Sequence, residues 1–282
     1  MQIGLIAGGG ELPLIVTRDA REQGYRVVTV ALEDIAPAGL NELSDEIRWV
    51  NPGKFGELIE TLKARNVRKA IMAGKVSKSL LYKSKVLPDM RAVKLLFSLK
   101  DRSDDSILKA ITEELRGEGI EVIDIASFSP HLLTPEGPLT RKRPSQEQWK
   151  DIAYGWRIAK QIGLLDIGQT VVVKDRAVLA VEAIEGTDEA IRRAGQWSDG
   201  GAVVVKVSKP HQDMRLDVPV VGSTTLATMI EARASVLAIE AFRSMILNRQ
   251  ALLTEAEEAG IAVVGVTDGA FPAERPLGST RT

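Results

Sequence analysis

The densest group of chemically active side chains lies between Val205 and Thr224, in the sequence VKVSKPHQDMRLDVPVVGST. Its polar members are Lys206, Lys209, His211, Gln212, Asp213, Arg215 and Asp217. Carboxylates can bind a divalent cation and position water, and Lys or Arg can neutralise the charge on phosphoryl oxygens. The combination predicts a bond-breaking reaction on phosphate. A charged loop with internal ion pairs is the alternative, and the more frequent fate of such runs.

The backbone conformation of this segment decides whether two aspartates can bind one ion. In an extended chain Asp213, Arg215 and Asp217 point to one face, but the outer Cα atoms lie roughly 13 Å apart. Val218 precedes a proline, which favours extension near Asp217. Either the chain bends there, or one carboxylate serves as ligand or base while the other binds Arg215.

Composition narrows the chemistry further. The chain has 282 residues, a net charge of −1 and no cysteine, which excludes disulfides, thiolate zinc sites and thiol nucleophiles. With His131 and His211 as its histidines, a metal site would be built from oxygen ligands and would hold Mg²⁺ or Mn²⁺. Lys and Arg are spread along the chain, so no nucleic-acid surface is expected.

The N-terminus lacks a basic leader followed by an apolar core, and no apolar run approaches the ~20 residues of a membrane span. These observations predict a cytoplasmic protein. They remain compatible with peripheral contact at the inner membrane and with a homodimer.

A glycine-rich turn follows the first apolar run. Gln2 to Ala7 is predicted to be a strand, and Glu11 to Gln23 a helix, with Gly8, Gly9 and Gly10 between them. Such a turn can let backbone N–H groups approach a phosphate, or it can simply close a tight connection. The dinucleotide fingerprint is incomplete because Pro13 stands where its third glycine would fall.

Alternating strand and helix patterns continue and predict an α/β protein. Gly74 and Lys75 follow a predicted strand, Lys69 to Ala73, and could bind phosphate, although the P-loop spacing is absent. The length favours two domains. The predicted boundaries are 1–130 for the N-terminal domain, 131–144 for a linker, 145–266 for the C-terminal domain and 267–282 for a disordered tail.

Several segments, taken together, resemble the LpxI-type UDP-2,3-diacylglucosamine pyrophosphatases of lipid A biosynthesis. They are IGLIAGGGELP, DDSILKAI, LDIGQTVVVK, VEAIEGTDEAIRRAG and KVSKPHQDMRLDVPVVGSTT, in the order of that family, from Ile3 to about Gly265. The resemblance implies a Rossmann-like N-terminal parallel sheet and a C-terminal α/β catalytic domain. It also implies Mg²⁺-dependent hydrolysis of a lipid-linked UDP-sugar to UMP and 2,3-diacylglucosamine 1-phosphate (lipid X).

On this resemblance, Asp213 is the leading metal ligand or base, Asp217 is the second carboxylate, and Gln212 joins the catalytic group. Lys206, Lys209 and Arg215 would face the phosphates, with Arg215 best suited to bidentate contact.

The other matching positions are weaker candidates. Glu182, Glu185, Thr187 and Asp188 could complete the metal shell or hold the sugar, or Thr187 could simply cap a helix. Asp166 and Gln169 could bind the nucleotide or fix a turn. The glycine turn and Lys75 would hold nucleotide or sugar. His211 departs from the family pattern; it could transfer a proton, but packing is expected.

Two other functions compete with hydrolysis. The glycine turn also suits a non-catalytic module that binds a nucleotide or a lipid precursor. A nicotinamide-dependent oxidoreductase is disfavoured by the broken glycine spacing.

Overall fold

The computed structural model describes residues 1–76, 88–99, 104–216 and 218–271. The chain divides into two compact units. The N-terminal unit contains Met1–His131 and Gln212–Val218, and the C-terminal unit contains Leu132–His211 and Pro219–Thr282.

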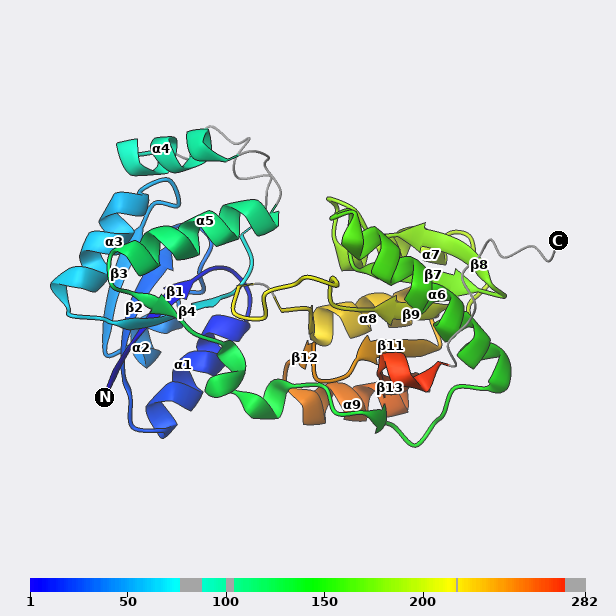
Figure 1. The fold of residues 1–282 in the computed structure, drawn as a ribbon. Helices are drawn as coiled ribbons and strands as arrows, with labels where there is room; N and C mark the ends of the chain where they lie inside the picture. Colours follow the sequence, from blue (N-terminus) through cyan, green and yellow to red (C-terminus); the bar gives the residue numbers. More distant parts are fainter. Residues whose placement is uncertain (77–87, 100–103, 217, 272–282) are drawn as a thin grey trace. The chain divides into compact units, whose positions relative to one another are not determined.

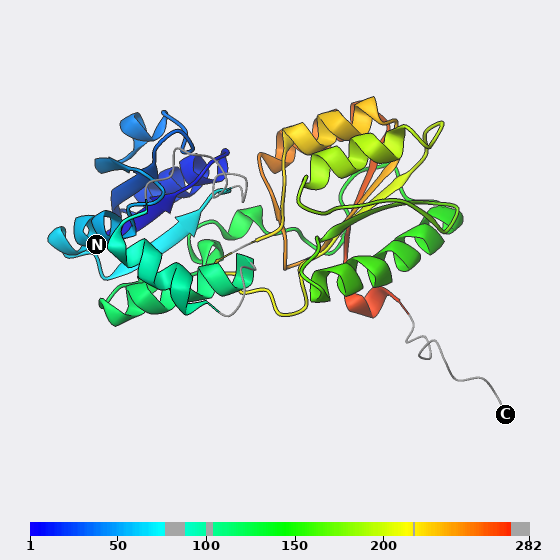
Figure 2. The ribbon, with the colours of Figure 1, turned by 90° about the horizontal axis from the view of Figure 1, so that it is seen from above.

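The N-terminal unit is built on a parallel sheet with helices on both faces (Figures 1 and 2). In spatial order its strands are β3 (Glu46–Val50), β2 (Arg26–Leu32), β1 (Gln2–Ala7), β4 (Lys69–Ala73) and β5 (Glu121–Val122). Its helices are α1 (Leu12–Glu22), α2 (Leu40–Leu43), α3 (Phe55–Ala64), α4 (Met90–Ser98) and α5 (Asp104–Gly117). Strands β1 and β2 are mainly apolar and buried because helices cover both faces of the sheet. This confirms the predicted Rossmann-like parallel sheet.

The last strand of this unit, β5, covers only two residues of the largely apolar segment Ile120 to Ile125. It ends at Val122, and Ile125–Ser127 forms a 3₁₀-helix instead. Asp124 caps that turn because its carboxylate accepts a hydrogen bond of 2.9 Å from the Ala126 N–H.

The segment Gln212–Val218 belongs to the N-terminal unit although the chain on both sides of it folds into the C-terminal unit. Leu216 packs against the apolar cluster beneath α3 and α5. The Leu216 N–H donates to the Asp213 carbonyl at 2.9 Å, which closes a turn. The extended conformation considered for this segment is therefore wrong, and the chain bends at Asp213.

The C-terminal unit has a mixed sheet in the order β6 (Gly137–Pro138), β13 (Ala262–Val266), β11 (Val236–Glu240), β9 (Val203–Lys206), β7 (Thr170–Lys174) and β8 (Ala177–Val181). Strands β13, β11 and β9 are parallel, and β6, β7 and β8 are antiparallel to their neighbours. A short ladder joins β10 (Val220–Val221) to β12 (Met245–Ile246). The unit confirms the predicted second α/β domain.

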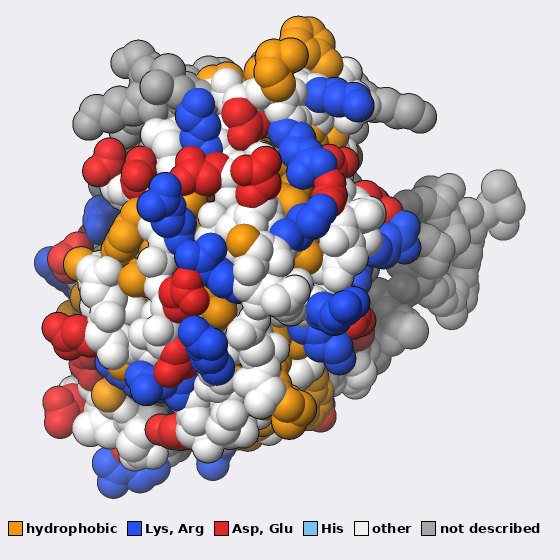
Figure 3. All heavy atoms as spheres, turned by 90° about the vertical axis from the view of Figure 1, so that its left-hand side faces the viewer, with side chains coloured by type: hydrophobic (Ala, Val, Ile, Leu, Met, Phe, Trp, Pro, Cys, Tyr) orange, Lys and Arg blue, Asp and Glu red, His pale blue; other side chains and the backbone are white. Residues whose placement is uncertain are grey.

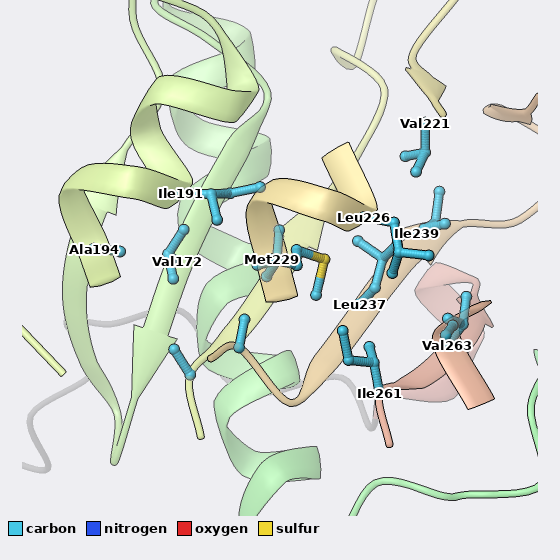
Figure 4. Packing of buried hydrophobic residues seen from close by; sticks show 14 of the residues in the cluster. Val172, Ile191, Ala194, Val221, Leu226, Met229, Leu237, Ile239, Ile261 and Val263 are labelled. Atoms are coloured by element: carbon cyan, nitrogen blue, oxygen red, sulfur yellow. The ribbon is translucent and has the colours of Figure 1, made fainter. Parts of the chain in front are cut away.

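Helices cover both faces of this sheet (Figure 2). They are α6 (Gln146–Leu164) on one face and α7 (Thr187–Gly195), α8 (Ser223–Glu231) and α9 (Arg249–Glu258) on the other. Ile191 of α7 and Met229 of α8 pack with Val172 and Leu237 of the sheet (Figure 4). Burial of these side chains stabilises the unit by about 1.5–3 kcal/mol each.

Two segments expected to lack structure are ordered in part. Gly137 and Pro138, inside the expected linker, form β6 because they pair with β13. Within the tail that was expected to be disordered, 267–282, Asp268–Ala270 form a 3₁₀-helix. There the Asp268 carboxylate accepts a hydrogen bond of 2.7 Å from the Trp156 Nε1–H, and the Phe271 ring contacts the Trp156 ring at a tilt of 53°. Residues 272–282 lie outside the described part of the chain.

Within the described residues, no helix combines the length and the apolar character needed to cross a bilayer. On the face drawn in Figure 3, acidic and basic side chains are intermingled over the surface.

The turns after β1 and β4 are joined by their backbones. The Gly8 N–H donates to the Ala73 carbonyl at 2.8 Å, and Gly9 and Lys75 exchange two hydrogen bonds of 2.9 Å. This approach requires glycine at position 74, whose φ is +96° and where an added Cβ would lie 2.7 Å from Gly8 C and from Gly9 O.

We expect Gly74→Ala to lower the free energy of unfolding of the N-terminal unit by about 2–5 kcal/mol, since the new methyl group clashes with backbone and strains φ. Hydrogen exchange of β1 and β4 peptides in increasing urea measures this change. Gly117→Ala is the matched control: no atom lies within 4 Å of the added Cβ, so the change should stay within about 1 kcal/mol. Equal exchange in both variants would contradict the packing argument.

Candidate functional site

The N-terminal unit offers a ligand position at the carboxyl ends of β1 and β4. The strand order reverses between these two strands, and such switch points open a crevice in parallel sheets. The amides of Gly8 and Gly9 are already engaged with carbonyls across this gap. Pro13 removes a further donor from the start of α1. The predicted contact with nucleotide or sugar therefore rests on Gly10, beside which a Cβ would meet open space, and on the exposed Lys75.

The C-terminal unit gathers charged side chains at the carboxyl ends of its parallel strands. Lys206 ends β9, Glu240 ends β11, and the two strands are adjacent. Ser208 and Lys209 follow β9 directly. This polar segment therefore begins where a strand ends.

Lys206 is buried rather than exposed at this edge, with 3% of its surface accessible. Its ammonium donates to the Thr187 hydroxyl at 2.6 Å, and that hydroxyl donates to Glu182 at 2.8 Å. Thr187 therefore links a cation to a carboxylate, and the N-cap of α7 is Gly186. A buried lysine needs such a partner because an isolated charge is costly in the interior.

The pKa of Glu182 depends on its burial and on its charged and polar neighbours. Burial alone raises it, but the charge of Lys206, the Thr170 and Thr187 hydroxyls and the Gln169 N–H together hold the pKa below its ordinary value. Glu182 is therefore ionised at neutral pH and neutralises Lys206.

Gln169 lies next to this cluster. Its N–H donates to Glu182 at 3.2 Å, and its carbonyl accepts from the Val207 N–H at 3.0 Å. Its side-chain Oε1 is buried and has no hydrogen-bond partner among the described residues. A buried acceptor of this kind is satisfied by a donor from a ligand or by water.

Lys209, also buried, forms an ion pair with Asp166. Asp166 occupies a left-handed conformation with φ of +54° directly after α6. This pair connects the segment after β9 to the end of α6. Asp166 thus contacts a predicted catalytic lysine, which its position in the sequence did not reveal.

The predicted metal ligands of the C-terminal unit have protein partners of their own. Glu185 forms an ion pair with Arg193, and Asp188 accepts a hydrogen bond of 2.7 Å from the Thr225 hydroxyl. Their carboxylates hold the start of α7 to its surroundings.

Asp213 and Arg215 form a local pair in the N-terminal unit. The guanidinium binds both carboxylate oxygens, from Nε at 2.9 and 3.2 Å and from Nη2 at 2.6 Å, and the Arg215 N–H adds a bond of 3.0 Å. The bonds from Arg215 lower the pKa of Asp213 by more than partial burial raises it, and the charge of the nearby Lys109 lowers it slightly further. The pKa of Asp213 therefore lies below its ordinary value. The same contact raises the pKa of Arg215.

The neighbours of this pair differ in accessibility. Gln212 is buried, and Asp217 lies outside the described residues. His211 is exposed, so the expectation that its imidazole packs is wrong.

The described residues do not fit a preformed magnesium site. In the part of the chain that the structure describes, no group of three Asp, Glu or His side chains could hold a metal ion. Asp213 instead binds a guanidinium, and Glu185 and Asp188 have the partners given above.

Glu240 is a buried carboxylate that the sequence prediction missed. Its side chain is 5% exposed and accepts bonds of 2.7 Å to each oxygen from Lys160, 2.6 Å from the Ser208 N–H and 2.8 Å from the Ser208 hydroxyl. It therefore fixes the chain directly before Lys209. The available signal was an apolar strand, Val236 to Ile239, that ends in glutamate.

A shallow depression of about 670 Å³ on the N-terminal unit contains none of the predicted site residues. Its charged groups pair with each other, since Glu118 binds both Lys63 and Arg91, and Asp89 caps α4. Its lining is therefore explained by packing, and we do not assign it a ligand. The lining residues are Gly56, Glu60, Lys63, Asp89, Met90, Arg91 and Glu118.

Comparison with known proteins extends over the whole chain. A family model described as the LpxI N-terminal domain matches residues 2–132, and one described as the LpxI C-terminal domain matches residues 135–264. A UDP-2,3-diacylglucosamine pyrophosphatase LpxI of Caulobacter vibrioides is 33% identical over 286 residues, which cover 98% of this chain and 99% of the relative.

Similarity to solved structures is weak. A CobK precorrin-6A reductase is 14% identical with a TM-score of 0.33, covering 97% of this chain and 90% of its own. The biotin carboxylase subunit of a pyruvate carboxylase is 11% identical with a TM-score of 0.26, covering 65% and 38%. Neither score supports an inference about fold or function.

We expect Lys206→Met to destabilise the C-terminal unit by about 3–5 kcal/mol at pH 7, because it leaves Glu182 ionised and buried without its cation. In the variant the pKa of Glu182 should rise above its ordinary value of 4.5, whereas in the wild type it lies below that value. The loss should therefore shrink as the pH falls from above 4.5 to below it. Urea unfolding at several pH values measures both effects.

The double variant Lys206→Met with Glu182→Gln is the control. It removes both charges and should recover much of the lost stability. A Lys206→Met penalty that is independent of pH and of residue 182 would mean that the two charges do not interact.

Proposed function

The chain belongs to the LpxI family, and from this we propose that it hydrolyses the pyrophosphate bond of UDP-2,3-diacylglucosamine. The products are UMP and 2,3-diacylglucosamine 1-phosphate. The observation that carries the proposal is the 33% identity to a named UDP-2,3-diacylglucosamine pyrophosphatase, which extends over 98% of this chain and so includes both units. Both family models match as well, one for each half of the chain.

The reaction sets requirements that the described residues can be compared with. Water forms a bond to one phosphorus, the bond from that phosphorus to the bridging oxygen breaks, and the bridging oxygen leaves with the other phosphate. The negatively charged oxygens of the diphosphate repel a nucleophile. Cations must therefore neutralise this charge, and a fixed group must orient the water. Lys209 and Arg215 are cations of this kind at the predicted segment.

Asp213 suits the role of an ionised acceptor. Arg215 holds its pKa low and fixes both of its oxygens, and its side chain is still 25% exposed. An ionised carboxylate with a low pKa accepts a hydrogen bond from water, or binds a cation, across the neutral pH range. We infer that Asp213 orients the attacking water.

Magnesium stays a prediction, with manganese as the alternative. The described carboxylates form no group of three metal ligands, so no step of the reaction is assigned to the ion. A bound Mg²⁺ would neutralise the phosphate oxygens as a hard cation. The residues predicted to hold it are Asp213, Asp217, Glu185 and Asp188. The cytoplasmic location, peripheral contact with a membrane and a homodimer likewise stay predictions.

Asp213→Asn should lower kcat for UMP release by about 100-fold or more, because the amide keeps the shape but loses the charge that orients water. Release of UMP from UDP-2,3-diacylglucosamine measures this, with Mg²⁺, with Mn²⁺ and with EDTA. Asp34→Asn is the matched control in the same unit: it is an exposed aspartate, and Asn tolerates its φ of +59°.

Near-normal turnover of the Asp213 variant would remove this residue from the mechanism. Binding of the substrate without UMP release by the wild-type protein under every metal condition would favour the non-catalytic binding module instead. Full activity in EDTA would overturn the magnesium prediction alone.

Arg215→Ala should move the acid limb of the pH profile of kcat/KM to higher pH. The activity that needs ionised Asp213 is present above its pKa and is lost as the pH falls through it. Arg215 keeps that pKa low, and without it the pKa returns toward its ordinary value. Arg215→Lys retains a charge and should move the limb less. An unchanged limb in Arg215→Ala would show that Asp213 does not set it.

A further inference from the structure

The turn after β11 brings an arginine to the edge that carries Lys206 and Lys209. Glu240 ends the strand, and Arg243 follows it within a tight turn. Arg243 Nε donates to the Ser208 hydroxyl at 2.8 Å and lies 3.8 Å from a Glu240 oxygen. Arg243 therefore contacts the residue directly before Lys209.

The position of Arg243 is fixed by buried groups. The Ser208 hydroxyl donates to Glu240 at 2.8 Å, so its oxygen is oriented to accept from Arg243. Glu240 is in turn held by Lys160, whose ammonium also lies over the Trp156 ring at 5.3 Å. A guanidinium held in this way loses little conformational entropy when it binds a ligand.

The backbone of the turn is constrained as well. Phe242 has a φ of +61°, a left-handed conformation that is rare for a bulky side chain. Its N–H donates to the Thr134 carbonyl at 2.8 Å, and the Ser244 hydroxyl donates to the Glu240 carbonyl. These bonds hold a strained turn that directs Arg243 toward Ser208.

The terminal nitrogens of Arg243 remain accessible. The guanidinium side chain is 42% exposed, and its hydrogen bond to the described residues uses Nε. Nη1 and Nη2 form no hydrogen bond with the described residues. These two nitrogens form the fork that matches two oxygens of a phosphate.

The surrounding cations are more fully compensated. Lys209 binds Asp166, Lys206 interacts with Glu182 through Thr187, and Lys160 binds both oxygens of Glu240. Among the described residues Arg243 has no carboxylate of its own, since it shares Glu240 at 3.8 Å with Lys160 at 2.7 Å. Its charge is therefore the one most available to an anion.

We propose that Arg243 is a further phosphate-binding residue of this protein, which contacts a phosphate of the nucleotide diphosphate through Nη1 and Nη2. Glu240 is its positioning residue and acts through Ser208. The assignment of the anion to the substrate rests on the proposed function. The alternative is that Arg243 only clamps Ser208.

The test compares Arg243→Ala and Arg243→Lys with Arg192→Ala. Arg192 is the matched control, because it is an arginine of the same unit that is 46% exposed and pairs with Glu189 on α7. Calorimetry measures binding of inorganic pyrophosphate and of UMP, and UMP release measures kcat and KM. Thermal unfolding of each variant shows whether the fold is retained.

Loss of one charge-assisted contact should weaken pyrophosphate binding and lower kcat/KM by about 10- to 100-fold in Arg243→Ala. Arg243→Lys should recover part of this loss, and Arg192→Ala should match the wild type. A clamp on Ser208 alone would instead lower the unfolding temperature and leave pyrophosphate affinity unchanged.

Unchanged affinity in Arg243→Ala would overturn the proposal, and so would a wild-type protein that binds neither pyrophosphate nor UMP at millimolar concentration. The two proposals fail separately. If the wild type binds pyrophosphate and Arg243→Ala binds it more weakly, Arg243 is a phosphate ligand even if no UMP is released from UDP-2,3-diacylglucosamine.

Discussion

The C-terminal unit depends on pairing each buried cation at the carboxyl edge of its sheet with a carboxylate from another element. Lys206 on β9 meets Glu182 through Thr187, and Lys160 on α6 meets Glu240 on β11. A buried charge without its partner is penalised by several kcal/mol, so each pair restricts where its two elements can lie. The segment after β9 is fixed between these pairs, and this is the segment in which the sequence concentrates its reactive side chains.

The N-terminal unit solves a different problem, namely how two strand ends approach closely. Its solution is glycine: Gly8 and Gly74 let the turns after β1 and β4 share backbone hydrogen bonds where a Cβ would clash. The glycines of this turn are therefore explained first by packing, and a ligand-binding role is left mainly to Gly10. The incomplete dinucleotide fingerprint and the hydrogen-bonded amides of Gly8 and Gly9 both argue against a dinucleotide-binding loop. A loop that binds pyrophosphate must keep its N–H groups unpaired.

Sequence reasoning found the elements with strong local signals. The runs Gln2–Ala7 and Lys69–Ala73 were predicted with the observed bounds, since an apolar run between turn residues suffices for a buried strand. Two-residue strands such as β6 and β10 have no period to detect. The ion pairs of the candidate site likewise include one that is local in the sequence and one that is not. Asp213 and Arg215 are two residues apart and could be paired from the sequence, whereas Lys160 and Glu240 meet only because α6 packs on the face of the sheet that contains β11.

Burial then separates residues that spacing alone had grouped as phosphate ligands. Lys206 is 3% exposed and donates a hydrogen bond to Thr187, so its main role is to stabilise the fold. It can affect a phosphate mainly through its electric field. Contact requires a cation whose donors point outward, which Arg243 has through Nη1 and Nη2. A site for a diphosphate thus needs both kinds of cation. Buried pairs keep the strand edge in place, and an exposed guanidinium attached to them can bind the anion without having to be ordered first.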